Sequence, residues 1–187
     1  MKTTKIEKKK TNYFEMDEVL IDKQYYVGSY NAAIHWRLLD ASDFLSKSAS
    51  DPFRLPLNKR TFGLINTEQD GKQVLMSNPT RTIIDLLDKP KLVESIYMVE
   101  KALVNYTNSQ YKDFELMFQY AHSFPSGAFY KRLGFLLERN FPNKTELINH
   151  CLKNISRGYS YLDTRNMSDK IISKWNLWIS QEMKHNP

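Results

Sequence analysis

Cysteine is nearly absent from this sequence, in which Cys151 is the single example among 187 residues. One cysteine cannot form an intramolecular disulfide, and it leaves no second thiolate for a metal site. Long apolar runs are also missing, since none approaches the roughly 20 residues that span a bilayer, and the N-terminal segment is too polar for a signal peptide. The sequence therefore predicts a cytoplasmic protein that is neither secreted nor inserted in a membrane.

The motifs that usually bring catalytic groups together are also missing. The four histidines lack metal-binding spacing, and the six glycines form neither a dinucleotide-binding nor a phosphate-cradling loop. No nucleophile elbow occurs, and the spacing of Asp85 and Asp88 is typical of a solvated helix end, with a glycosidase-like or metal-clasping pair as the alternative. We therefore expect no catalytic residues, metal or cofactor, and the sequence predicts that the protein is not an enzyme.

Positive charges exceed negative charges by 6, but most of this excess is local. The first ten residues carry five lysines and one glutamate, a net charge of +4 (Lys2, Lys5, Lys8, Lys9, Lys10 and Glu7). The remaining chain has too small an excess to attract a polyanion generally, so contact with nucleic acid would need a local cluster or this segment. We expect residues 1–23 to be a flexible basic arm, with phosphate binding as its alternative role.

The rest of the chain shows the patterns of one domain, expected over residues 24–182 and followed by a tail at 183–187. The segment "QYYVG" is typical of a buried strand, and Ser29 is placed to cap the helix that follows. A Gly after Asp70 separates two apolar runs, which predicts a hairpin between Lys59 and Met76.

Helical patterns fill the middle of the sequence. Asn78 followed by proline is typical of a helix start, because the residue before proline takes extended angles and proline suits the first helical position. Further amphipathic segments follow, and Asn143 with Glu146 resembles a capping box for the helix that carries Cys151. Residues 168–182 fit either a helix or a strand. The expected fold is α+β, with a small, mainly antiparallel sheet packed against a helical group; the N-terminal strand, the hairpin and C-terminal strands would build this sheet.

Arg81 and Asp85 lie four residues apart in "SNPTRTIIDLLDKP". An exposed pair of this kind would stabilise a helix by only about 0.2–0.5 kcal/mol, and arginine in a first helical turn is disfavoured by the helix dipole. The pair makes better sense if Arg81 reaches a carboxylate or carbonyl elsewhere in the fold, or a ligand. A structural tertiary network and a contact with a partner therefore both stay open.

The segment "AFYKRLGFLLER" has two lines of interest on one expected helix. One apolar stripe faces the core, while Arg132, Phe135 and Arg139 form a second line at helical spacing. Arginine and aromatic residues commonly anchor interfaces, so these three are candidate partner-binding residues. The alternative is that Phe135 closes the edge of the core beneath the arginine stems. Gly134 costs roughly 1 kcal/mol of helix propensity relative to alanine, which indicates a close approach at that position.

Three stretches, "YYVGSYNAAIHWRL", "SNPTRTIIDLLDKP" and "YKRLGFLLE", occur in an order and spacing that resemble the C-terminal domain of AbiEi-type proteins. These are the antitoxin and transcriptional-regulator components of type IV toxin-antitoxin pairs in abortive infection, a form of phage defence. The later segments "YLDT" and "KWNLWIS" resemble the family's final strands, which favours strands over a helix at 168–182. The resemblance covers about Gln24 to Ser180. The residues that match the second and third motifs are Pro79, Arg81, Thr82, Asp85, Lys131, Arg132, Leu133, Gly134 and Glu138.

The resemblance implies a non-enzymatic domain that counters a nucleotidyltransferase-like toxin, with the toxin or its target as partner. Family members usually carry a winged helix-turn-helix ahead of this domain, whereas about twenty-three mostly polar residues precede Gln24 here. We therefore expect no such DNA-binding module, and DNA stays open as a partner. The alternative is a nucleic-acid-binding accessory or regulatory protein that uses local basic clusters, namely Lys2 to Lys10 and the line of Arg132 and Arg139. A nuclease or transferase ranks third.

Overall fold

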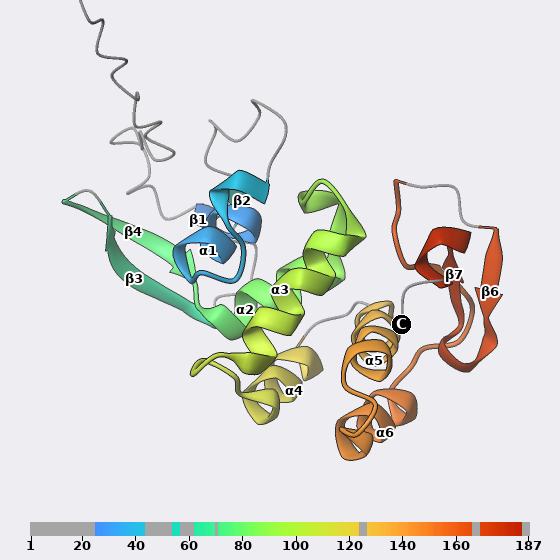
Figure 1. The fold of residues 1–187 in the computed structure, drawn as a ribbon. Coiled ribbons are helices and arrows are strands. Elements are labelled where there is room, and N and C mark those ends of the chain that lie inside the picture. Colours follow the sequence, from blue (N-terminus) through green and yellow to red (C-terminus); the bar gives the residue numbers. More distant parts are fainter. Residues whose placement is uncertain are drawn as a thin grey trace, which may run out of the picture.

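A computed structural model describes residues 25–43, 54–56, 62–69, 71–123, 127–165 and 169–184. Its fold is α+β, as the sequence predicts, with one small sheet at each end of the molecule and the helices between them (Figure 1). The expected basic arm at 1–23 lies outside the described residues. Met183, expected in the tail, is buried in the core.

The N-terminal sheet has the strand order β2 (Arg54–Pro56), β1 (Tyr25–Val27), β4 (Lys72–Ser77), β3 (Leu64–Gln69). Strands β3 and β4 form the predicted hairpin, and β1 pairs parallel with β4 and antiparallel with β2. Gly71 has a φ of +76°, which is why a glycine suits this turn.

The first helix, α1 (Ser29–His35), does not begin as expected. Gly28 is its N-cap, and Ser29 is already a helical residue. The Ser29 hydroxyl donates to the Leu92 carbonyl instead of capping, at 3.0 Å. The hydroxyl thus donates to a distant carbonyl, whereas the predicted cap would have accepted from a backbone N–H of the same helix.

The helix α2 (Pro79–Asp88) occupies the centre of the molecule (Figure 1). Its start is confirmed, because the Asn78 side chain accepts a hydrogen bond from the Arg81 backbone N–H and Pro79 is the first helical residue. The apolar residues of α2 are fully buried, with exposures of 0–1% (Ile83, Ile84, Leu86 and Leu87). The apolar side of α2 therefore belongs entirely to the hydrophobic core.

Four more helices complete the middle layer: α3 (Ile96–Asn108), α4 (Phe114–His122), α5 (Phe129–Asn140) and α6 (Thr145–Lys153). The predicted cap at Asn143 is wrong, because α6 begins at Thr145 after a turn in which the Lys144 N–H donates to the Phe141 carbonyl. None of the helices that the structure describes is long and apolar enough to cross a bilayer.

The C-terminal sheet has the order β5 (Ser160–Tyr161), β7 (Leu177–Ile179), β6 (Lys170–Ile172). Strands and the short 3-10 turns η5 (Ser173–Trp175) and η6 (Gln181–Lys184) make up the described part of the ambiguous segment 168–182. The prediction that these strands join the hairpin's sheet is wrong. The helices separate the two sheets, and each contains one parallel pair, β1 with β4 and β5 with β7.

Candidate functional site

All three sequence stretches that carry the resemblance meet on α2. Tyr26 of the first stretch contacts the start of α2, and Arg132 of the third contacts its end. These contacts join residues 44 to 59 positions apart in the sequence. The motif residues thus form two buried networks at opposite ends of one central helix.

The first network surrounds Arg81. Its Nε donates to Asp85 Oδ1 at 2.8 Å, its Nη1 to the Phe62 carbonyl at 3.1 Å, and its Nη2 to the Tyr26 hydroxyl at 3.2 Å. The Tyr26 hydroxyl donates to the second oxygen of Asp85 at 2.9 Å. Arg81 also lies 4.4 Å from the centre of the Phe62 ring. We call these four residues the Arg81 network.

Burial dominates the electrostatics of the Arg81 network. It raises the pKa of Tyr26 well above its usual range, so the hydroxyl keeps its proton and can donate to Asp85. Burial also raises the pKa of Asp85, while the charge and hydrogen bonds of Arg81 and the Tyr26 hydroxyl oppose this rise. Because Arg81 and Asp85 are 2% and 5% exposed, the structure favours the tertiary-network interpretation of this pair over a direct partner contact.

Replacing Tyr26 with phenylalanine is expected to lower the free energy of unfolding by about 1.5–2 kcal/mol, because a buried carboxylate and a buried guanidinium each lose one hydrogen bond. Urea unfolding of the purified protein measures this change. Tyr97→Phe is the matched control, since Tyr97 is exposed on α3 and should change stability little. Equal stabilities for the two variants would contradict the role given to the Tyr26 hydroxyl.

The second network surrounds Arg132, which is 4% exposed. Its Nε and Nη2 donate to the Tyr161 carbonyl at 3.0 and 2.8 Å, and its Nη1 donates to the carbonyls of Leu87 and Asp88 at 2.9 and 3.0 Å. Leu87 and Asp88 are the last two residues of α2, where helix carbonyls lack intrahelical partners and a cation is favoured. Arg132 therefore joins the end of α2 to β5.

Lys131 lies beside this bridge and is 1% exposed. Its Nζ donates to the Gly158 carbonyl at 2.6 Å and to the Ser160 hydroxyl at 3.2 Å. Burial lowers the pKa of Lys131, as does the charge of Arg132, and burial lowers the pKa of Arg132 to about 10. Neighbouring residues of α5 thus place two positively charged groups under the segment that leads into β5.

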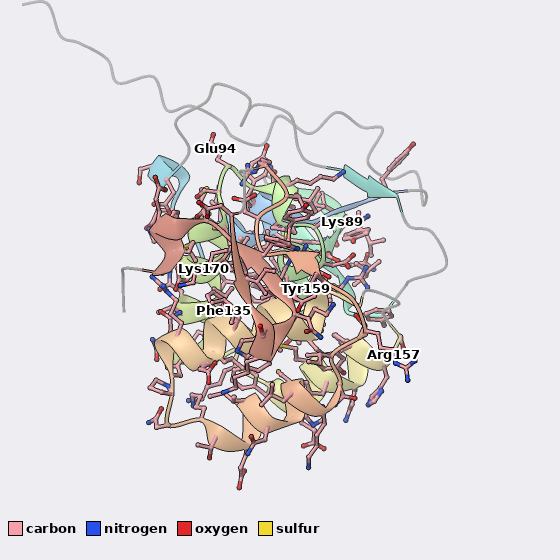
Figure 2. The ribbon with its side chains drawn as sticks, turned by 90° about the vertical axis from the view of Figure 1, so that its right-hand side faces the viewer. Lys89, Glu94, Phe135, Arg157, Tyr159 and Lys170 are labelled. Carbon is pink, nitrogen blue, oxygen red and sulfur yellow. The ribbon has the colours of Figure 1, made fainter. Side chains whose placement is uncertain are left out.

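The proposed contact line on α5 does not form one exposed surface. Arg132 is buried, and Arg139 forms an ion pair with Glu100 at 2.8 Å and donates to the Met183 carbonyl. Carbonyls and a carboxylate from distant segments occupy the guanidinium groups of both arginines, so the structure does not present them as an open contact surface. Phe135 is half-buried at the edge of the core, as the alternative interpretation expected, and keeps part of its ring open (Figure 2).

Gly134 is the point of closest approach between α5 and η5. A Cβ at this position would lie 2.1 Å from the Trp175 ring and 2.9 Å from Cys151 Cβ. Trp175 is fully buried, and its indole N–H donates to Glu138 at 2.7 Å. The close approach indicated by the sequence is therefore confirmed, and its partner is a tryptophan ring.

No group of three histidine, cysteine or acidic residues in the described parts of the chain could hold a metal ion. Asp85 belongs to the Arg81 network, and Asp88 contributes its backbone carbonyl to Arg132. Cys151 is fully buried as expected, and burial raises the pKa of its thiol to about 12. A thiol with this pKa is a weak nucleophile at neutral pH.

Two features escaped the sequence analysis. The sequence near Tyr26 does not indicate its role in the Arg81 network, because its partner Asp85 is 59 residues away. The outward face of the C-terminal sheet was also missed, although the alternation in "YSY" at 159–161 could have indicated it. No family model, curated protein or solved structure matches this chain.

Proposed function

We propose that this chain is an AbiEi-like antitoxin or regulator domain that counters a nucleotidyltransferase-like toxin without catalysing a reaction itself. One observation carries the proposal: the three stretches that resemble the family meet on α2 through side chains of their own motifs. Tyr26 joins the first stretch to the second, and Arg132 joins the second to the third. Contacts between the three motifs agree with their order in the sequence, and such agreement between levels supports one shared fold.

The buried networks support a structural task for the motifs, so the antitoxin activity is assigned to the exposed surface that they hold in shape. Phe135 is the motif-helix residue we propose as a contact with the toxin or its target, since Arg132 and Arg139 are occupied. The alternative proposal, a nucleic-acid interface, cannot use Arg132 and Arg139 either, because acceptors within the fold occupy both guanidinium groups. Its other part, Lys2 to Lys10, lies outside the described residues.

Rescue of toxin-expressing cells tests the proposal. A nucleotidyltransferase-like gene is expected beside the gene for this chain, and co-expression of the wild-type chain should restore colony formation. Phe135→Ala should reduce rescue at least tenfold while leaving the melting temperature within a few degrees, because the ring is only partly packed on the core. Tyr97→Ala, on exposed α3 surface, is the matched control and should rescue fully.

Two results would count against these proposals separately. Failure of the wild-type chain to rescue, with a soluble and folded product, would remove the antitoxin assignment. Full rescue by Phe135→Ala would remove Phe135 from the contact surface and leave the assignment in place.

A further inference from the structure

The outer face of the C-terminal sheet carries a row of aromatic and apolar side chains that are exposed, apart from the half-buried Trp178. Strand pairing sets Tyr161 opposite Trp178, and Trp178 opposite Ile171, across all three strands. Leu177 and Ile179, which alternate with Trp178, are buried, so this row faces outward. Tyr159 extends it, with its ring centre 6.3 Å from that of Trp178. We call Tyr159, Tyr161, Trp178 and Ile171 the aromatic row.

The aromatic row is unusual for this molecule. Tyr159 and Tyr161 are 53% and 52% exposed, more than any other large hydrophobic side chain in the described parts of the chain. Clustered exposed apolar side chains mark interaction surfaces more often than isolated ones do. A binding partner for this face is therefore a better explanation than chance exposure.

Positive charge gathers beside and beneath the row. Arg157 precedes Tyr159 by two residues. Lys89 follows Asp88, and Arg132 donates both to the Asp88 carbonyl and to the Tyr161 carbonyl. Both side chains are exposed, and neither forms an ion pair with any described residue. Figure 2 looks onto this side, with Tyr159 near the centre, Lys89 above it and Arg157 below it.

The buried cations add to this field. Lys131 and Arg132 lie directly under the segment from Gly158 to Tyr161, and they donate to neutral carbonyl and hydroxyl oxygens. The carboxylates of Asp88 and Asp163 act on Arg132, but Asp163 also pairs with Arg165 at 3.5 Å, so these acids offset the positive charge only in part. Charges in a weakly polarisable interior project further than exposed ones, so the β5 edge should attract anions.

We infer that the aromatic row binds single-stranded RNA, with bases stacked on Tyr159, Tyr161 and Trp178 and phosphates at Arg157 and Lys89. Aromatic rings on an open sheet with cations at its edge are what single-stranded RNA requires, since each base offers a π face and each nucleotide a negative charge. The cations argue against an apolar partner surface. This inference is independent of the proposed antitoxin activity, because binding is measured on the purified protein.

Fluorescence anisotropy with a labelled ten-nucleotide uridine RNA tests the inference. The double variant Tyr159→Ala/Tyr161→Ala should bind at least a hundredfold more weakly than the wild type, at about tenfold for each lost stacking ring. Tyr97→Ala removes a tyrosine of 41% exposure from α3 and should bind as the wild type does. A variant with Lys8, Lys9 and Lys10 changed to alanine removes the charge of the basic arm. In this background the two tyrosine changes should still weaken RNA binding at least a hundredfold.

Salt dependence gives a second readout that does not rely on the tyrosine variants folding. Two phosphate contacts on a single strand give a slope of log affinity against log salt of about −1.4, and Arg157→Ala should reduce it to about −0.7. The arm variant is the background for this measurement, so that its lysines do not add to the slope. An unchanged slope would overturn the role of Arg157.

Three results would overturn the inference. The first is no binding of the RNA, and the second is equal affinity of the wild type and the double tyrosine variant for it. The third is tighter binding of a thymidine DNA decamer or of an RNA duplex than of the uridine RNA. Sedimentation of the wild type as a dimer, with the double variant a monomer, would assign the row to a second copy of this chain. Loss of affinity only in the arm variant would assign binding to the arm.

Discussion

Alanine in place of Arg132 is expected to lower the free energy of unfolding by about 3–5 kcal/mol, because three carbonyls each lose a charged donor. The change removes the donors to three carbonyls, those of Leu87, Asp88 and Tyr161, from an arginine that is 4% exposed. It also removes the cation at the C-terminal end of α2 and the link between that helix and β5. The loss should therefore appear as a lower urea midpoint for the whole domain.

Two control variants make this result specific to the geometry of the guanidinium group. Arg132→Lys keeps the charge, but one ammonium group cannot reach the same set of carbonyls, so most of the loss should remain. Lys174→Ala removes an exposed ion pair with Glu138 and should cost less than about 1 kcal/mol. Stability of Arg132→Ala within 1 kcal/mol of the wild type would show that the three carbonyls find other donors.

Alanine in place of Gly134 is expected to destabilise the protein by about 2 kcal/mol, although alanine is the better helix former. Helix propensity alone would stabilise the variant by roughly 1 kcal/mol. The added methyl group would lie 2.1 Å from the ring of Trp175, which is fully buried and held by Glu138. The ring must move from its packed position, and overpacking of this kind outweighs the gain in propensity.

A double-mutant cycle with Trp175→Leu isolates this clash. The smaller side chain should cost stability by itself, because it leaves a cavity beside α5. Added to that background, Gly134→Ala should cost at least 1 kcal/mol less than it does in the wild type, since the methyl group then has room. An increase in stability on Gly134→Ala in the wild type would contradict the close packing of α5 against η5.

These two expectations decide which variants can report on function. Changes at Arg132 and Gly134 should weaken rescue and RNA binding alike through loss of the folded state. Changes at Phe135, Tyr159 or Tyr161 leave both buried networks in place and can separate the two activities. A chain that binds RNA but does not rescue would support the inference about the aromatic row alone.

The sequence by itself determined the features that depend on neighbouring residues. Asn78 and Pro79 start α2 because the extended angles before a proline suit an N-cap, and Gly71 permits the turn of the hairpin. Apolar spacing located the helices and the inward position of Cys151. Where the local signal was incomplete, the helix start differed from the prediction: the N-cap of α6 is Lys144, whose N–H donates to the Phe141 carbonyl, and not Asn143.

Only the tertiary structure decided what the arginines of α5 do and how many sheets the fold has. Spacing along the helix gave Arg132, Phe135 and Arg139 a common line, but the carbonyls that occupy Arg132 come from residues 29 to 45 positions away. Likewise, local alternation can propose a strand without identifying the sheet it joins. The exposure of a side chain and the partner of a strand depend on segments distant in the chain, which meet only when the fold brings them to α2.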